Sequence, residues 1–274
     1  VEEDWRALAF AEAQVRADRA VVLAALRQSA YALLYVAPEL RADKDIVLDA
    51  IGRDWAAIEF AAPSLKSDPE VVIAAVKQYG RALGFASESL RDNKRVVLAA
   101  VAQDWRALEY ASDRLKADHE VVLAAVQQDA FAFLHAAQRL KEDRHFVLSA
   151  IRVNNNVVQI AASPEFMGDR DFVLQAAQRN GNALQYAATE LKADREIVLA
   201  AVQRNGTALQ YAAQEFQSDH EIVLAAVQQH GGALQFAASE VRADRRIVLA
   251  AVQQLRNGLG VGAERVHPRP EGVP

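Results

Sequence analysis

The amino-acid sequence predicts an all-α fold, an α-solenoid of ten tandem helix-turn-helix repeats with a degenerate C-terminal cap. Three observations support it: a unit of 25 residues that recurs along the chain, an apolar pattern of helical spacing inside each unit, and an Asp at one fixed position. Segments 104–128 (DWRALEYASDRLKADHEVVLAAVQQ) and 180–204 (NGNALQYAATELKADREIVLAAVQR) match at most positions. The repeats begin at Asp4, Ser29, Asp54, Tyr79, Asp104, Asp129, Asn154, Asn180, Asn205 and His230. The repeat at Asn154 alone has 26 residues, with the extra residue in 163–166.

Each repeat is predicted to hold two short helices. The first carries the pattern Ala-Leu-x-aromatic-Ala-x-x-x-Leu, as in 107–115, whose spacings of three and four place the apolar residues on one face. The second reads Val-Val-Leu-Ala-Ala-Val, and Asn-Gly at 180–181 and 205–206 provides a turn between helices. An Asp at position 15 is expected to be its N-cap, because its side chain accepts a hydrogen bond from a free N–H of the first turn. These caps are Asp18, Asp43, Asp68, Asp118, Asp143, Asp169, Asp194, Asp219 and Asp244, with Asn93 as the exception.

Stacking of repeats is expected to form the core, because helices this short are not stable alone in water. We expect Ala at positions 4, 8, 21 and 22 to let helices approach closely. Large residues at positions 5, 7, 12, 18 and 20 are expected to fill the space between them.

Both ends of the sequence belong to the pattern. Residues 1–3 align with 126–128, the tail of a second helix, so we expect the array to extend further in the N-terminal direction. Because the sequence begins at Val1 without Met, we expect a processed product or a fragment. One repeat array is predicted over 1–266, in which 255–266 form the half-repeat cap, with Leu259, Val261 and Val266 at positions 5, 7 and 12. The Pro-rich tail 267–274 is expected to be extended or disordered.

Composition excludes several classes of protein. The 274 residues include 31 Lys and Arg, 36 Asp and Glu and no Cys, which leaves a formal net charge of −5 and excludes disulfides and thiolate metal sites. The 52% hydrophobic content is too high for a disordered chain, and charges interrupt every apolar run before it could span a membrane. The acidic balance argues against a generic nucleic-acid binder, and no secretory signal opens the sequence. The compartment is left open.

The repeated unit resembles a known family. The pattern ALxYAsxeLKaDrEvVLaAVqqnG, as in 183–206, is similar to the domain-of-unknown-function 4116 repeats, and the resemblance covers residues 1 to about 254. It implies a helical repeat protein with no assigned enzymatic activity and offers no catalytic residues to carry over. The sequence departs from the pattern at Trp in position 2 of alternate N-terminal repeats, at His135 and Ile160 in the aromatic position, and in the 26-residue repeat.

No catalytic, cofactor-binding or metal-binding residues are predicted. His119 and His220 share position 16 in repeats four apart, and no His-x3-His or His-Glu-x-x-His spacing exists. The Asp residues are explained as caps. Glu at position 17 lies in a first turn, where the helix dipole favours negative charge. No Gly-rich phosphate loop follows a strand, so we expect the chain not to be an enzyme.

Basic residues form two rows that flank the capping Asp. They are either a ridge for an anionic partner or a set of charges that pair between neighbouring repeats, and the interleaved Asp and Glu favour pairing. Position 13 holds Arg16, Arg41, Lys66, Arg91, Lys116, Lys141, Lys192 and Arg242, and position 16 holds Arg19, Lys44, Lys94, Arg144, Arg170, Arg195 and Arg245.

Aromatic and amide residues form two further rows. Trp5, Trp55 and Trp105 alternate at position 2 with the small residues Ala30, Gly80 and Ala130, a pattern of packing complementarity or of an exposed stripe that anchors a partner. With Arg6 and Arg106, the three Trp are the candidate partner-binding residues. In the C-terminal half a polar row indicates a solvated face: Gln159, Gln185, Gln210 and Gln235 at position 6, with Gln128, Gln229 and Gln254 at repeat ends.

The predicted function is a non-enzymatic helical-repeat scaffold that mediates protein–protein interaction, such as a structural or linker subunit of a larger assembly, either cytoplasmic or organellar. Its expected partners are proteins of that assembly. Peripheral membrane contact and a small-molecule ligand stay open. One alternative is a repeat appendage of a larger enzyme or effector. Another, less favoured by the acidic balance, is a nucleic-acid-binding helical repeat protein.

Overall fold

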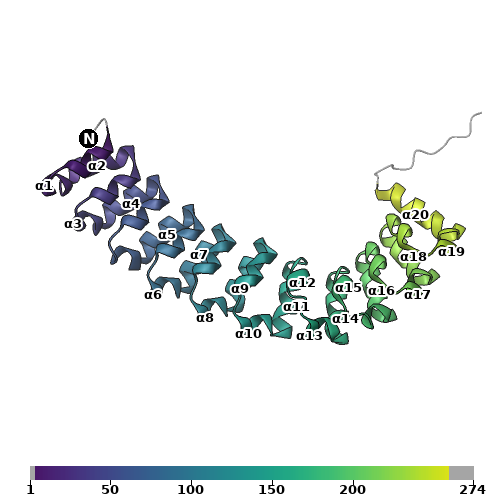
Figure 1. Cartoon of the computed structure of the whole chain (residues 1–274). Helices are drawn as coiled ribbons and strands as arrows, with labels where there is room; N and C mark the ends of the chain where they lie inside the picture. The colour runs from purple at the N-terminus through teal and green to yellow at the C-terminus, as the bar shows by residue number, and fades with distance from the viewer. Residues whose placement is uncertain (1–3, 259–274) are drawn as a thin grey trace, which may run out of the picture. The chain divides into compact units, whose positions relative to one another are not determined.

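A computed structural model describes residues 4–258, which contain helices and turns and no β-strand (Figure 1). The chain divides into two compact units, an N-terminal unit of residues 1–160 and a C-terminal unit of residues 161–274. Both consist of the predicted repeats, so the all-α repeat fold is confirmed. Residues 255–258 extend the last helix, and the rest of the predicted cap and the tail lie outside the described residues.

Each repeat contains three helical segments, whereas the sequence predicted two. A first segment, mostly 3-10, is followed by a middle turn of three to five residues and then by a long α-helix, of ten residues in all but the last. The first segments are η1 (Trp5–Phe10), η2 (Ala30–Tyr35), η3 (Trp55–Phe60), η5 (Gly80–Phe85), η6 (Trp105–Tyr110), η7 (Ala130–His135), α12 (Val157–Ile160), α15 (Ala183–Tyr186), η9 (Gly206–Tyr211) and η10 (Gly231–Phe236). The middle turns are α1 (Ala13–Arg16), α3 (Pro38–Arg41), η4 (Leu65–Ser67), α6 (Glu88–Arg91), α8 (Asp113–Lys116), α10 (Gln138–Lys141), α13 (Pro164–Gly168), η8 (Leu191–Ala193), α17 (Gln214–Gln217) and α19 (Ser239–Arg242).

The long helices pack against their neighbours within each unit. In the N-terminal unit α4, α5, α7, α9 and α11 follow one another, and in the C-terminal unit α14, α16, α18 and α20 do so (Figure 1). The long helices are α2 (Arg19–Gln28), α4 (Lys44–Arg53), α5 (Pro69–Gln78), α7 (Lys94–Gln103), α9 (His119–Gln128), α11 (Arg144–Val153), α14 (Arg170–Arg179), α16 (Arg195–Arg204), α18 (His220–Gln229) and α20 (Arg245–Gly258).

An inter-repeat backbone hydrogen bond accounts for the break in the predicted first helix. Ala111 and Ser112, at positions 8 and 9, are extended, and the Ser112 N–H donates to the carbonyl of Arg91 in the preceding repeat at 3.0 Å. The same bond from position 9 to position 13 recurs in both units, as from Ala62 to Arg41 and from Ala213 to Lys192. A continuous helix would use this N–H internally, so the tie to the neighbouring repeat requires the chain to leave the helix here.

The capping prediction is confirmed. The Asp118 carboxylate accepts hydrogen bonds from the backbone N–H groups of Glu120 and Val121, and the equivalent bonds recur in most repeats, Asn93 included. A second cap was not predicted: Asp104 at position 1 accepts from the N–H of Arg106 and begins the first segment.

The core differs from the prediction at four helix positions. Val122 and Val126, at positions 19 and 23, are fully buried, whereas Leu123 and Ala124, at positions 20 and 21, are partly exposed. Successive helix residues are about 100° apart, so positions 18, 19, 22 and 23 share one face and positions 20 and 21 lie to either side of it. Positions 4, 5, 8 and 12 are buried as predicted in most repeats, as in Ala107, and the position 7 aromatics are half-buried except Phe10, which is 91% exposed.

The glutamines at repeat ends join neighbouring repeats. Gln128 Oε1 accepts from the N–H of Trp105 at 3.1 Å, while its Nε2 donates to the carbonyl of Val101 in the preceding repeat at 2.5 Å. Gln229 and Gln254 likewise accept from the N–H groups of Gly206 and Gly231, and they donate to the carbonyl of the last residue of the preceding repeat. The predicted exposure holds for Gln128 and Gln229, while Gln254 is partly buried; the bonds were not predicted, and through them each residue satisfies backbone groups left open at helix ends.

Replacing Gln128 with Ala is expected to lower the free energy of unfolding by roughly 0.5–1.5 kcal/mol, because it removes the hydrogen bonds to a backbone N–H and a carbonyl. The matched control is Gln127→Ala, one residue earlier, whose exposed side chain makes no recorded hydrogen bond. Urea denaturation followed by circular dichroism measures both. Equal effects of the two substitutions would contradict the proposed link.

Candidate interaction surface

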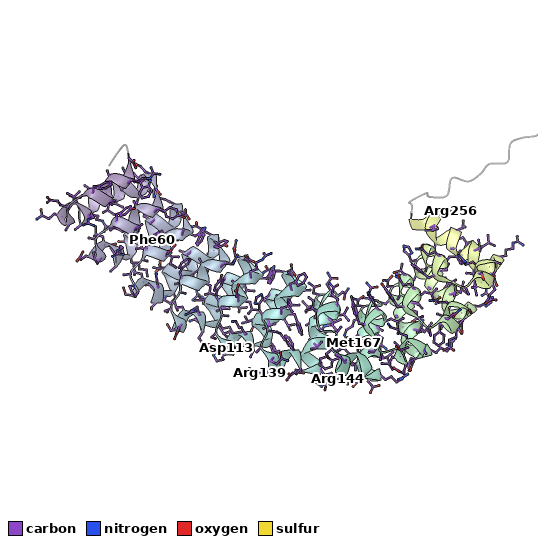
Figure 2. The ribbon with its side chains drawn as sticks, viewed as in Figure 1. Phe60, Asp113, Arg139, Arg144, Met167 and Arg256 are labelled. Atoms are coloured by element: carbon purple, nitrogen blue, oxygen red, sulfur yellow. The ribbon has the colours of Figure 1, made fainter. Side chains whose placement is uncertain are left out.

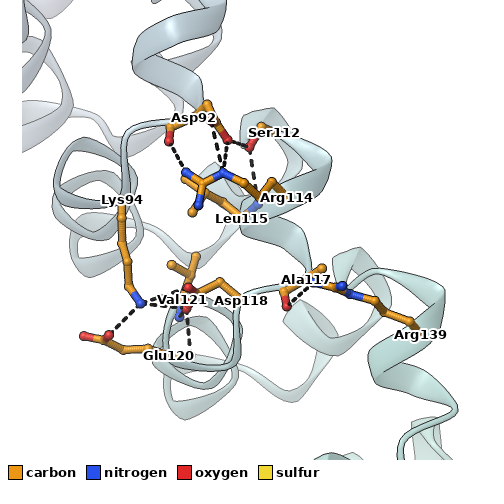
Figure 3. Close-up of polar contacts among 10 residues, drawn as sticks. All are labelled: Asp92, Lys94, Ser112, Arg114, Leu115, Ala117, Asp118, Glu120, Val121 and Arg139. Carbon is orange, nitrogen blue, oxygen red and sulfur yellow. Dashed lines mark hydrogen bonds and ion pairs between the residues drawn. The ribbon is translucent and has the colours of Figure 1, made fainter.

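A ladder of ion pairs runs along the edge where the middle turns meet the long helices. The Lys94 ammonium lies 2.9 Å from Asp118 and 2.7 Å from Glu120 of the next repeat (Figure 3). Lys44 and Arg170 contact the corresponding pair of acids in the repeats that follow them. The cations at position 16 therefore pair between repeats, which was the favoured of the two predicted readings.

These contacts shift the pKa values of the paired groups. The pKa of Lys94 is raised, mainly by its hydrogen bond to Glu120 and next by its hydrogen bond to Asp118. Burial acts to raise the pKa of Asp118, but hydrogen bonds from Lys94 and from the Val121 N–H outweigh it and the pKa is lowered. The pKa values of Asp43, Asp68 and Asp194 are lowered as well. The ion pairs of the ladder thus favour the ionised form of the capping Asp carboxylates.

Replacing Asp118 with Ala is expected to lower the free energy of unfolding by about 1 kcal/mol through loss of the N-cap. A lowered folded-state pKa means that the carboxylate stabilises the fold above its unfolded pKa of about 4, and that this contribution is lost as pH falls through the folded value. Denaturation between about pH 6 and pH 2 should therefore show a smaller acid-dependent loss in Asp118→Ala than in the wild type. Asp118→Asn is the control that keeps the cap, as Asn93 does naturally. If both variants lose stability with falling pH as the wild type does, the assignment of Asp118 as an N-cap that stabilises the fold in its ionised form is contradicted.

Further contacts tie the middle turns together. Arg114 binds both the carboxylate and the backbone carbonyl of Asp92, which also accepts from the Ser112 hydroxyl, and Arg139 donates to the carbonyl of Ala117 (Figure 3). Asp113 and Arg139 lie along the lower edge of the ribbon in Figure 2, where α8 and α10 run. Polar groups at this edge are therefore largely engaged within the array.

The cations at position 13 are mostly half-buried. The ammonium groups of Lys66 and Lys141 donate to the carbonyls of Glu59 and Leu134, at position 6 of their own repeats. Arg16 and Arg41 instead bury Nε atoms that have no hydrogen-bond partner.

The three predicted Trp lie between consecutive first segments. All are half-buried, and each ring faces an aromatic residue of the next repeat: Trp5 faces Tyr35 at 6.1 Å, Trp55 faces Tyr79 at 4.3 Å and Trp105 faces His135 at 6.0 Å. The guanidinium groups of Arg6 and Arg106 lie 5.3 and 4.7 Å from the rings of Trp5 and Trp105. The structure therefore gives these Trp a packing contact and leaves part of each ring accessible.

Exposed apolar side chains next to the Trp were missed by the sequence analysis. Tyr31 and Leu34 are 45% and 47% exposed, and Phe131 and Leu134 are 55% and 53% exposed. They occupy positions 3 and 6 of η2 and η7, and Tyr31 lies 5.9 Å from the ring of Phe60. We call the side chains at positions 2, 3, 6 and 7 of the first segments the first-segment face. The signal was present in the sequence, since most other repeats carry polar or small residues at positions 3 and 6.

The C-terminal unit is polar at the same positions. Asn182, Thr207 and Gly232 stand at position 3, and the exposed Gln185, Gln210 and Gln235 stand at position 6. The predicted exposure of this Gln row is confirmed. The first-segment face thus carries exposed apolar side chains at positions 3 and 6 of η2 and η7 in the N-terminal unit, and polar or small residues at these positions in the C-terminal unit.

Neither a metal cluster nor a membrane span emerges from residues 4–258. They contain no group of three or more His, Asp or Glu placed to hold a metal ion. No helix in the same range has both the length and the apolar character needed to cross a membrane.

One family model matches the chain. Its description is "Domain of unknown function (DUF4116)", and it matches at residues 18–66, 43–91, 68–116, 93–141, 118–167, 143–192, 169–217, 194–242 and 219–259. Most of the matched windows are about two repeats long and advance by one repeat, so the family unit coincides with the repeat described above. No curated protein and no solved structure matches the chain.

Proposed function

Since the chain belongs to the family of the domain of unknown function DUF4116, a family of tandem helical repeats here spanning residues 18–259, we propose that it is a non-enzymatic scaffold. It binds a protein partner through the first-segment face of the N-terminal unit. This role suits a structural or linker subunit of a larger assembly.

The exposed apolar residues at positions 3 and 6 carry the proposal. Exposed Tyr, Phe, Leu and Arg beside half-buried Trp form the composition typical of the centre of a protein interface, where aromatic residues and Arg are enriched. The fold does not require apolar residues there, because the C-terminal unit builds the same segments with Asn, Thr and Gln. Their presence in the N-terminal unit is thus best explained by a partner.

The use of the charged groups supports a role without catalysis. Capping carboxylates accept backbone hydrogen bonds, and in several repeats the same carboxylates pair with position 16 of the preceding repeat. Acids and bases held in such bonds serve the stacking of repeats. The pairing also neutralises the row of cations that a nucleic-acid backbone would need.

Site-specific photo-crosslinking in the native assembly tests the proposal. A benzophenone side chain is placed at Tyr31, Arg106 or Phe131, and matched controls carry it at Asn182 or Thr207, which hold position 3 in C-terminal repeats. We expect protein adducts from the first three sites and none from the controls. Adducts confined to the C-terminal sites, or adducts with nucleic acid, would contradict the proposal.

A further inference from the structure

A groove opens beside the first-segment face, between α1 of the first repeat and the end of η2 with α3 of the second. It encloses about 630 Å³. Leu34, Tyr35, Val36 and Pro38 form its apolar wall, and Arg16 and Arg41 lie at its charged side. Tyr35 also faces Trp5, so the groove is continuous with the aromatic residues of the proposed interface.

The two arginines in this groove lack a counter-ion. Within residues 4–258, neither Arg16 nor Arg41 has an acidic oxygen within ion-pair distance, and Glu39, which also lines the groove, pairs with neither. Two lysines at the same position in other repeats, Lys66 and Lys141, donate to carbonyls of their own repeats, Lys66 at 2.7 Å, whereas Arg91 at this position has a buried Nε without a partner. Arg16 and Arg41 likewise hold buried Nε atoms without partners. A half-buried cation without an acid beside it favours an anion supplied from outside the chain.

The apolar wall selects the kind of anion. Leu34 is nearly half exposed, Val36 is buried, and Tyr35 lines the groove while its ring also faces Trp5. A bare inorganic anion would leave this wall exposed to water. A large apolar side chain next to a carboxylate would cover the wall and reach the guanidinium groups together, with charge-assisted hydrogen bonds to the forked Arg donors.

We propose that this groove binds an extended segment of the protein partner in which a large apolar residue adjoins Asp or Glu, an inference that rests on the proposed function. The apolar side chain lies on Leu34 and Tyr35, and the carboxylate binds Arg16 and Arg41. The groove then anchors one end of a contact that continues along the first-segment face.

Selection from a random-peptide display library on the full chain, in low salt, tests this inference. We expect enriched peptides to contain a Leu, Ile or Phe beside an acid, and their affinity to fall with rising salt. The double variant Arg16→Gln/Arg41→Gln should weaken binding of a selected peptide about tenfold or more, whereas Arg27→Gln, an exposed cation on α2, should leave it unchanged.

A second variant covers the case in which the double variant is unstable. Leu34→Gln places at position 6 the residue that four C-terminal repeats carry, so the fold should accept it, and it should weaken the same peptide. Selection that enriches no acidic–apolar peptides, or peptides indifferent to Arg16, Arg41 and Leu34, would overturn the inference. Because crosslinking from Arg106 and Phe131 does not involve the groove, it reports on the proposed function separately.

Discussion

The double variant Phe131→Asn/Leu134→Gln is expected to lose most of its affinity for the native partner, by roughly 30-fold or more. Truncating a hot-spot residue at the centre of an interface costs about 2 kcal/mol or more, which corresponds to that factor. The substitutions introduce the residues that Asn182 and Gln185 provide at the same positions of another repeat, so the first segment should form normally. Both side chains are more than half exposed, and the thermal midpoint should therefore change little.

Affinity for the co-purified partner measures this loss, with circular dichroism as the check on folding. The matched control is Thr207→Asn/Gln210→Asn, which alters positions 3 and 6 of a C-terminal repeat and should leave binding unchanged. Acrylamide quenching of the Trp residues adds a readout, because half-buried indoles at the interface should become less accessible when the partner binds. Full affinity in the Phe131→Asn/Leu134→Gln variant would show that η7 is not part of the interface.

Replacing Leu108 with Ala is expected to lower the free energy of unfolding by about 2–5 kcal/mol. Leu108 is fully buried at position 5, and removing its side chain adds the free energy of an unfilled cavity to the lost burial. This is a large share of the roughly 5–15 kcal/mol that stabilises a typical native protein. Because repeats depend on their neighbours, hydrogen exchange should accelerate first in the repeats next to η6.

Leu123→Ala is the matched control for Leu108→Ala. The same side chain is removed, but Leu123 at position 20 is partly exposed, so the loss should be clearly smaller. Chemical denaturation of the two variants compares the positions directly. Equal losses would mean that position 20 belongs to the core, as the sequence pattern alone predicted.

Local patterns were enough to predict the repeat, its helical character and its caps. Asp118 is recognisable as an N-cap because capping depends on a side chain and the N–H groups two and three residues later. The pairing of Lys94 with Asp118 was foreseeable for a similar reason, since stacking of identical repeats places the same positions side by side. The candidate Trp were also found from periodicity alone, although their contacts with Tyr35, Tyr79 and His135 were not.

Contacts between repeats determine the structural features that could not be predicted from the sequence. The apolar spacing of the first segment is compatible with one helix, and only the bond from Ser112 to Arg91 in the preceding repeat shows why the chain breaks there. Gln128 is indistinguishable from Gln127 by composition, yet its end-of-helix position places it on two open backbone groups. The groove of Arg16 and Arg41 likewise exists only where two repeats meet.

The sequence by itself therefore determined the fold class, the repeat boundaries and the caps, because these depend on contacts within a few residues. The tertiary structure decided the three-segment repeat, the bonds of the repeat-end glutamines and the groove, because these depend on groups about 25 residues away that only stacking brings into contact.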